Sequence, residues 1–296
     1  MDLFNFKLNK IKKWLHNGNN INERKQYGLT ELNNAALNGH AHIVQYLIEQ
    51  GANIYIPDQY NNTPLLNAIR YNHIKIVDMI LYYCTNKQQI LYNTNRIGNT
   101  ALHIACEEGH LDMIDHIMKH INVPNYIELL NNEGNTPIML AVQSGHANVL
   151  QKLIDMKCDI YTFNNQNNTL LMIACEKGYY NIVKILLLSM LNSTLQHKNI
   201  DGNMAIHLAS LNGHLSIVKL LIEHNCDIEW TNSNNETILL LAYKANHLSI
   251  VSYLLENKAN YDYMNQEDIN ELNQQLNTYL NTQYIGMNYV QTSFIY

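Results

Sequence analysis

The chain has 296 residues, 47% hydrophobic and only 15% charged, a composition that excludes a largely disordered protein. The net charge of -6 predicts no strong attraction to nucleic acid or to an anionic membrane. The longest apolar run, residues 182–191, is broken by Lys184 and is too short to span a bilayer, and residues 1–16 contain no apolar stretch of signal-peptide length. Asparagine, which occurs 46 times, supplies much of the uncharged polar surface.

The cysteines predict a reducing compartment. They are odd in number, widely spaced and contain no C-x-x-C pair: Cys84, Cys106, Cys158, Cys175 and Cys226. This pattern fits neither a disulfide framework nor a zinc finger. We therefore expect a cytoplasmic protein.

Residues 1–22 are predicted to form a capping segment. Apolar residues recur there at the spacing of one helix face: Phe4, Leu8, Ile11 and Leu15. An Asn-Gly turn at Gly18 follows them. Several lysines lie among these residues, so a basic amphipathic helix on a membrane surface is the alternative interpretation of residues 3–16.

Residues 23–261 contain seven similar units. Each has a turn triplet that begins with Gly or Asn, the residue types that best tolerate a positive φ, and successive triplets lie 33 to 37 residues apart: Gly28, Asn61, Gly98, Gly134, Asn167, Gly202 and Asn235. Ten residues after each triplet stands a His or Tyr: His40, His73, His110, His146, Tyr179, His214 and His247. Two such columns in register over seven units indicate a structural repeat.

Each unit predicts two helices. In six of the seven units the first follows a Thr that can cap it, and Pro64 and Pro137 occupy its first turn in two units. The second carries a broad apolar stripe such as Ile43, Val44 and Leu47. Three units are longer by four, three and two residues, and the spacing of the columns places each insertion after the second helix.

These columns resemble the ankyrin repeat, whose pattern reads G-x-T-P-L-H-x-A-A-x-x-G-H-x-x-I-V-x-L-L-L-x-x-G-A-x-V, over about residues 3–261. The resemblance implies an all-α solenoid of helix-turn-helix units with short β-hairpin turns. Residues 1–22 then form an N-terminal capping half repeat and residues 23–261 form seven ankyrin repeats. A C-terminal capping helix is expected over residues 262–280, and residues 281–296 form a tail that we leave unassigned.

The chain departs from the family pattern where a helix-ending glycine is replaced by Lys157, Asn225 and Lys258. A lysine held in the left-handed backbone region costs about 1 kcal/mol. The fourth and seventh repeats are therefore expected to be locally weaker if that conformation is kept.

Catalytic motifs are missing from the sequence: it has no G-x-x-x-x-G-K-[ST], G-x-S-x-G, H-E-x-x-H or Gly-rich dinucleotide turn. We interpret the histidine columns as structural, with a metal site at His116, His120 and Asp112 as the alternative. We expect no cofactor and no metal.

Catalytic side-chain pairs are also unsupported. His103 and Cys106 share a helix face, but Cys106 occupies a column of small buried residues. Glu107 and Glu108 diverge on their helix, and Glu176 lies two repeats away, so these carboxylates predict an acidic patch. We therefore expect no enzyme.

The resemblance implies protein binding in an extended concave groove lined by hairpin tips and by one face of the first helices. By register, we expect the partner to contact Tyr27, Tyr60, Arg70, Tyr71, Glu107, Glu108, Gln143, Glu176, Lys177 and Lys244. Tyr and Arg are common interface anchors, so an aromatic and basic end is predicted beside an acidic centre.

The expected function is thus a non-enzymatic scaffold for a protein partner of unknown identity, without nucleic-acid binding and as a monomer. The chain also resembles ankyrin proteins of intracellular bacteria and large DNA viruses. One interpretation is therefore an effector that acts on a host protein in the host cytosol. The alternatives are an effector with cryptic enzymatic activity and membrane-surface association through the basic N-terminal helix.

Overall fold

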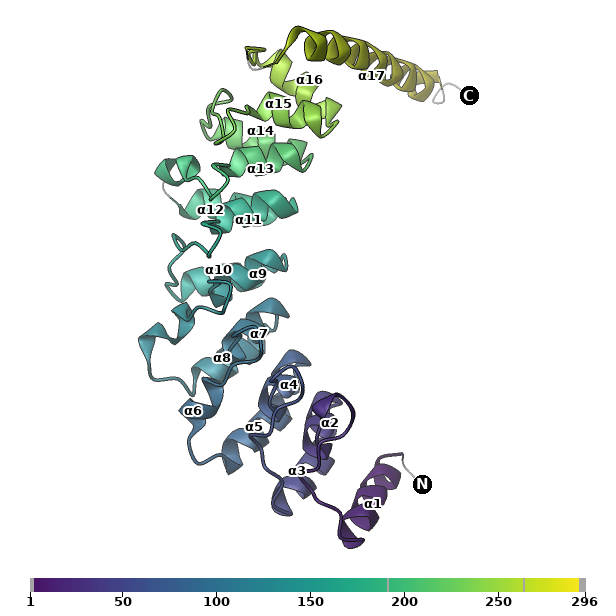
Figure 1. Ribbon diagram of the computed structural model, residues 1–296, viewed down its shortest axis with the longest axis vertical. Helices are drawn as coiled ribbons and strands as arrows, with labels where there is room; N and C mark the ends of the chain where they lie inside the picture. The colour runs from purple at the N-terminus through teal and green to yellow at the C-terminus, as the bar shows by residue number, and fades with distance from the viewer. Residues whose placement is uncertain (1–2, 191, 263, 293–296) are drawn as a thin grey trace. The chain divides into compact units, whose positions relative to one another are not determined.

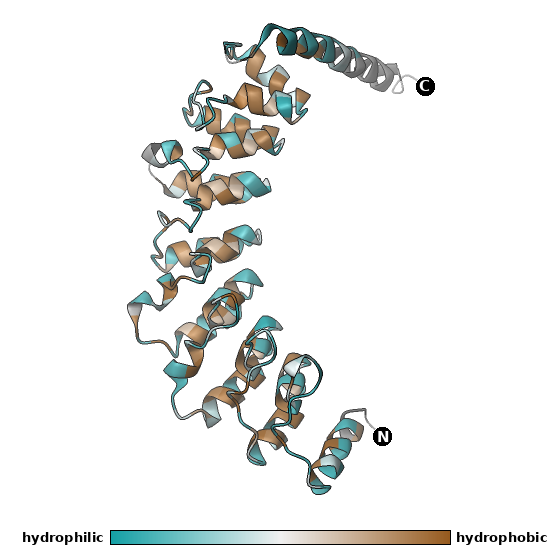
Figure 2. Ribbon diagram, in the orientation of Figure 1, coloured by the Kyte–Doolittle hydropathy of each residue, from teal (hydrophilic) through white to brown (hydrophobic). Residues whose placement is uncertain are grey.

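The computed structural model describes residues 3–190, 192–262 and 264–292 and divides the chain into two compact units, Met1–Asp159 and Ile160–Tyr296. Within each unit, short helices stack in antiparallel pairs (Figure 1). Figure 2 shows hydrophobic residues concentrated in these pairs and hydrophilic residues in the connecting loops. The predicted fold class, an all-α ankyrin-type solenoid, is confirmed.

The first unit contains a lone N-terminal helix and four helix pairs. Its first helices, α2, α4, α7 and α9, pack in succession, and each also packs on the second helix of its own pair. The elements are α1 (Leu3–His16), η1 (Gln26–Gly28), α2 (Glu31–Leu37), α3 (Ala41–Glu49), α4 (Pro64–Arg70), α5 (Ile74–Tyr83), α6 (Lys87–Leu91), α7 (Ala101–Glu107), α8 (Leu111–Met118), η2 (Pro124–Glu128), α9 (Pro137–Gln143) and α10 (Ala147–Asp155).

The second unit contains three helix pairs and a long last helix that packs on α16. The elements are α11 (Leu170–Lys177), α12 (Tyr180–Ser189), η3 (Asn192–Gln196), α13 (Ala205–Leu211), α14 (Leu215–Glu223), α15 (Ile238–Lys244), α16 (Leu248–Glu256) and α17 (Gln266–Thr292). Helix α17 continues through most of the stretch that the sequence left unassigned, and residues 293–296 lie outside the described residues.

The predicted turns have the expected backbone. All seven triplets begin with a residue at positive φ, from 58° at Asn235 to 82° at Gly98. In most repeats a Thr that follows the turn caps the first helix. Thr63 Oγ1, for example, accepts the backbone N–H of Leu66 at 3.4 Å. Two of the hairpins carry an isolated β-bridge, Phe163 with Thr169 and Thr231 with Thr237.

The histidine column joins successive repeats. His110 Nε2 lies 2.9 Å from the carbonyl oxygen of Arg70, and His146 Nε2 lies 2.8 Å from that of Glu107. These carbonyls belong to the last turn of the preceding first helix, where no intrahelical donor is available. The column is therefore structural, as the sequence predicted.

Asparagine forms a second inter-repeat ladder that the sequence analysis missed. In each turn from the second repeat onward, an Asp or Asn side chain accepts two backbone N–H groups of its own hairpin, as Asn95 Oδ1 does from Ile97 at 3.1 Å and Asn99 at 2.9 Å. Neighbouring turns then bond to each other, because Asn131 Nδ2 donates to Asn99 Oδ1 at 2.8 Å. This ladder accounts for part of the asparagine excess.

The insertions lie after the second helices, as predicted, and form one-turn helices in α6, η2 and η3. In the first unit two insertions touch, since the fully buried Tyr126 of η2 donates its hydroxyl to the Leu91 carbonyl of α6 at 2.7 Å. The replaced helix-ending glycines keep positive φ: 64° at Lys157, 66° at Asn225 and 68° at Lys258.

Candidate protein-binding surface

The candidate aromatic anchors in the first unit are exposed. Tyr27 and Tyr60 stand at consecutive hairpin tips, and the Gln59 amide donates to the Tyr27 carbonyl at 2.9 Å. Tyr71 directly follows α4 and stacks on His73, with ring centroids 6.4 Å apart. Because His73 is bonded to the preceding repeat through the Leu37 carbonyl, the Tyr71 ring lies against a fixed support.

Arg70 is paired with the acidic residues of the next repeat. Its Nη1 lies 2.6 Å from Glu108 Oε1 and its Nη2 lies 3.7 Å from Glu107 Oε2. The sequence placed a basic residue beside an acidic centre, and in the structure these charges meet, because α4 and α7 pack side by side. The pair fixes Arg70 rather than leaving it free as an anchor.

Glu107 is half-buried, and most of the charged side chains near it are acidic. Burial raises the pKa of its carboxyl, the Arg70 guanidinium lowers it, and the nearby charges of Glu108 and Glu133 raise it again. The Asn99 amide reaches Glu107 Oε2 at 3.5 Å. A partner cation placed here would stabilise the charged form of Glu107.

Three of the expected contact residues belong to the second unit. Glu176 and Lys177 are neighbours, with Lys177 Nζ 3.5 Å from Glu176 Oε1. Lys244 Nζ lies 2.7 Å from Glu236 Oε1, and the pKa of Glu236 is lowered first by its hydrogen bond from Asn232 and then by Lys244. Gln143 is half-buried at the end of α9 in the first unit. One continuous groove through both units stays a prediction.

The surroundings of the buried histidines and cysteines suit a structural role. His103 Nε2 donates to the Asn135 carbonyl at 3.0 Å, and burial lowers the pKa of His103 and of His207 to about 4. The five cysteines are free and buried, and burial raises the pKa of Cys106 and Cys175 well above its usual range. Such thiols are poor nucleophiles, because attack requires the thiolate.

The metal-site alternative finds no geometric support. His116 Nε2 lies 2.7 Å from Asp78 Oδ1 of the preceding repeat. The His120 ring packs edge-on against His116, with centroids 5.5 Å apart. Among the residues that the structure describes, no three His, Cys, Asp or Glu side chains are grouped to hold an ion.

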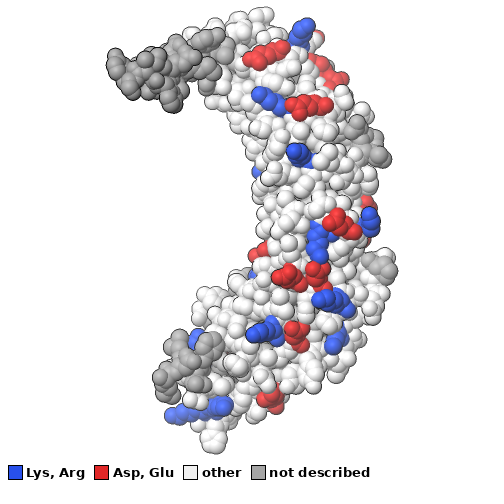
Figure 3. Space-filling model, turned by 180° about the vertical axis from the view of Figure 1, so that it is seen from behind, with Lys and Arg blue, Asp and Glu red and all other residues white. Residues whose placement is uncertain are grey.

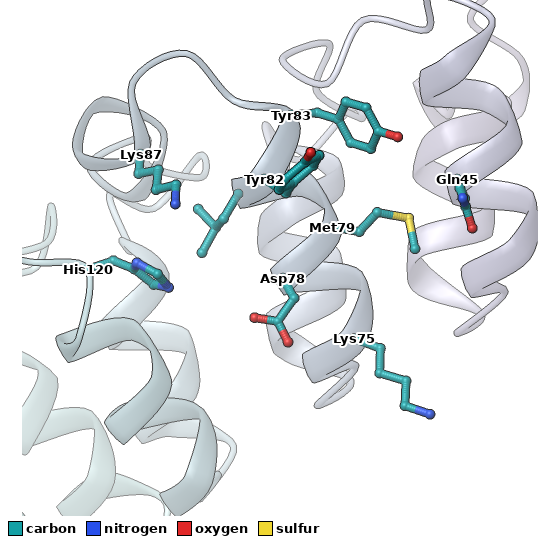
Figure 4. A pocket seen from close by; sticks show the side chains of 9 residues that line it. Gln45, Lys75, Asp78, Met79, Tyr82, Tyr83, Lys87 and His120 are labelled. Carbon is teal, nitrogen blue, oxygen red and sulfur yellow. The ribbon is translucent and has the colours of Figure 1, made fainter.

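A shallow hollow of about 560 Å³ lies on the second-helix side of the first unit (Figure 4). Asp78 and Tyr82 of α5 border it together with Lys87 of α6 and His120 after α8. Tyr82 is 78% exposed, and its ring packs edge-on against Tyr83. This hollow was not predictable from the sequence, because it is built from an insertion and from positions that differ between the repeats.

Lys12 and Trp14 of α1 pack against the first repeat. Lys12 Nζ lies 5.2 Å from the ring centroid of Tyr46, and Lys25 Nζ lies 4.5 Å from that of Trp14. On the face shown in Figure 3, acidic and basic side chains lie next to each other rather than in areas of one sign. In the described part of the chain, no helix is long and apolar enough to cross a membrane.

Comparisons with known proteins agree with this geometry. The family described as ankyrin repeats, in a form of three copies, matches residues 4–90, 83–164, 125–199 and 171–265. An ankyrin repeat protein of fowlpox virus is 31% identical over 121 residues, which cover 40% of this chain and 34% of the viral protein. The ankyrin repeat protein YahD of Escherichia coli is 27% identical over 147 residues, 50% of this chain and 70% of that protein.

A plant relative is longer. The E3 ubiquitin-protein ligase XBAT33 of Arabidopsis thaliana is 29% identical over 194 residues, 66% of this chain but 29% of the ligase. The chain thus spans about a third of the length of the viral and plant relatives. With the repeats confirmed in the structure and the family match extending from residue 4 to residue 265, the chain belongs to the ankyrin repeat family.

Proposed function

We propose that the chain is a non-enzymatic scaffold that binds a partner protein through the hairpin tips and the ends of the first helices. The observation that carries this proposal is the exposure of Tyr27, Tyr60 and Tyr71 on neighbouring repeats of one unit. Large aromatic side chains exposed on a rigid frame are typical interface anchors, because they bury much area at little entropic cost.

The rest of the proposed surface supplies polar contacts. Glu107 and Glu108 exceed the single charge of Arg70, which favours a partner segment with a basic residue near α7. In the second unit, Glu176, Lys177 and Lys244 extend the surface with groups of both signs. The expected partner therefore combines apolar side chains with local charges rather than one uniform charge.

We further propose that the partner is a host protein and that the chain acts as an effector in the host cytosol. The similarity to the fowlpox virus protein supports this proposal, since that relative is encoded by a large DNA virus. The enzyme alternative gains no support from the buried, proton-bound thiols. The membrane alternative is weakened by the packing of α1, whose Trp14 and Lys12 contact the first repeat.

Capture of partner proteins on the immobilised full-length chain tests the proposal. A Tyr71→Ala variant should lose most of the captured partner, because truncating a central aromatic anchor costs about 2 kcal/mol of binding energy. Tyr82→Ala is the matched control, since Tyr82 is an exposed tyrosine on the other side of the same unit. Equal capture by the wild type and by a Tyr27→Ala, Tyr60→Ala, Tyr71→Ala variant would refute the proposed surface.

Charge is tested separately. Replacing both Glu107 and Glu108 with lysine would place cations against Arg70. Such a variant would disturb the packing of α4 on α7 as well as the binding surface. Glu108→Gln removes one charge with little change of shape. It should mainly slow association with a basic partner, and less so at high salt.

A further inference from the structure

The first three hairpin tips share a pattern that the later tips lack. At each of them an exposed side chain that can donate hydrogen bonds precedes an exposed apolar side chain, in the pairs Gln26-Tyr27, Gln59-Tyr60 and Arg96-Ile97. Tyr27, Tyr60 and Ile97 are 58%, 56% and 45% exposed. The equivalent apolar positions in the later repeats are polar: Glu133, Gln166, Asp201 and Asn234. We call the three pairs the tip ridge.

Backbone hydrogen bonds set the spacing of the tip ridge. The Gln59 amide donates to the Tyr27 carbonyl at 2.9 Å, and the Arg96 amide donates to the Tyr60 carbonyl at 2.9 Å. The Ile97 carbonyl accepts from the next tip at 3.0 Å. Because neighbouring first helices pack about 10 Å apart, the backbones of the three tips are expected to recur at about that interval.

This interval selects among extended partner segments. A polyproline II helix has three residues per turn and a rise of about 3.1 Å, so every third side chain lies on one face about 9 Å apart. Alternate side chains of a β-strand are only about 7 Å apart, which falls out of step with the tips within two repeats.

The polar groups of the tip ridge favour the same choice. A polyproline II segment has no internal hydrogen bonds, so its carbonyl groups remain available as acceptors. Each tip supplies one exposed donor side chain, Gln26, Gln59 or Arg96, whereas the carbonyls of an α-helix are already used. Among the described residues, Arg96 has no acidic partner, so its charge favours an acidic residue in the segment.

We propose that the tip ridge binds a proline-rich segment of the partner protein in the polyproline II conformation. Apolar residues at every third position of the segment pack beside Tyr27, Tyr60 and Ile97, and an acidic residue pairs with Arg96. The aromatic rings supply the flat surfaces on which proline rings pack. This inference rests on the proposed protein-binding function and assigns the chemistry of the partner.

Three synthetic peptides and the full-length chain test the assignment by isothermal titration calorimetry. The first peptide has prolines at every third position and one acidic residue. The second has the same composition with prolines at every second position, and the third is a helical peptide with apolar residues seven apart, a spacing of about 10.5 Å. The first should bind at least about tenfold more tightly than the others, a difference of about 1.4 kcal/mol. Equal binding, a preference for another spacing, or no binding overturns the inference.

Variants locate the binding. Tyr27→Ala and Tyr60→Ala should each weaken binding of the first peptide about tenfold, and Arg96→Glu should weaken it further at low salt. The matched control Tyr82→Ala should leave the affinity unchanged. The truncated side chains are exposed, so circular dichroism should show wild-type helix content. When the first peptide is added to the wild-type chain, NMR chemical-shift changes that cluster at the three tips would support the inference. Changes elsewhere would overturn it.

The two proposals can fail separately. If the tip variants reduce capture of the natural partner while the proline-spaced peptide does not bind, the protein-binding surface stands and the polyproline assignment is wrong. If the peptide binds at the tips while capture is unaffected by Tyr27→Ala, Tyr60→Ala and Tyr71→Ala, the chemistry of the ridge is supported and the proposed function is refuted.

Discussion

Acid should destabilise this protein through two buried histidines, and His103 gives the sharper test. The backbone N–H of Thr100 donates to His103 Nδ1 at 3.3 Å, and His103 Nε2 donates to the Asn135 carbonyl at 3.0 Å. Both ring nitrogens are therefore used by the neutral form, and the Thr100 hydroxyl also lies 2.9 Å from Nδ1. Burial lowers the pKa of His103 from 6.5 to about 4.

The sign and size of the effect follow from these two pKa values. The unfolded chain takes up a proton near pH 6.5 and the folded chain only near pH 4, so the contribution of His103 is complete above pH 6.5 and is lost as the pH falls toward 4. At pH 5 the loss is about 2 kcal/mol for one such histidine. His207 has the same arrangement, with its pKa also lowered to about 4, and adds a similar amount in the second unit.

The chain itself supplies a substitution. Leu66 and Leu240 occupy the same repeat position as His103, so His103→Leu should be accepted by the fold. At pH 7 the variant should be less stable by about 1–3 kcal/mol, because the Thr100 amide and the Asn135 carbonyl lose their shared partner. At pH 5 this difference should shrink by about 2 kcal/mol.

Urea denaturation followed by circular dichroism at the two pH values measures the difference. The raised pKa of Glu107 and of Glu128 affects wild type and variant alike and cancels. His42→Gln, at an exposed position on α3, is the control and should leave the pH dependence unchanged. Parallel stability profiles for wild type and for a His103→Leu, His207→Leu variant would refute the account.

Three further predictions concern individual side chains. Lys157→Gly should raise the unfolding free energy by about 1 kcal/mol, because it removes a side chain from a left-handed residue at φ 64°; a lower urea midpoint would contradict this. Cys106→Ala with Cys175→Ala should cost about 1–2 kcal/mol and leave partner capture intact, whereas lost function in a folded variant would indicate thiol chemistry. Tyr126→Phe should lower the unfolding free energy by about 1–2 kcal/mol, because the buried Leu91 carbonyl loses its donor; an unchanged denaturation curve would show that the bond is dispensable.

The sequence predicted those features that a single residue type must satisfy. Gly and Asn tolerate a positive φ best, which is why the triplet column located every turn, and the insertions after Leu81 and Met118 followed from counting between columns. The asparagine column at Asn95 and Asn131 was also visible, since an Asp or Asn stands three residues before every triplet from the second onward. Its meaning required the hydrogen bonds of the hairpin.

Contacts between repeats were harder to predict. Arg70 and Glu108 are 38 residues apart, and one sequence does not indicate which pairs of variable positions meet when α4 packs on α7. The same limit hid the pairing of His116 with Asp78. Ile97 was missed for a different reason: it occupies the position of Tyr27 and Tyr60, but we did not count an aliphatic side chain there as an interface anchor.

Some polar side chains of this protein join one repeat to the next and form its frame, whereas others are exposed on the surface. This division limits how a partner can be recognised. Asparagine and histidine side chains bond repeat to repeat, and many of the charged groups pair with a neighbouring charge, as Lys152 does with Asp115 at 2.6 Å. Such pairs produce little long-range field, so the net charge of -6 contributes mainly to solubility. Selectivity must then come from short-range contacts at positions that the frame does not use. The exposed tyrosines of the first unit are such positions, and we therefore expect binding at the tips to change less with salt than binding near Glu107 and Glu108.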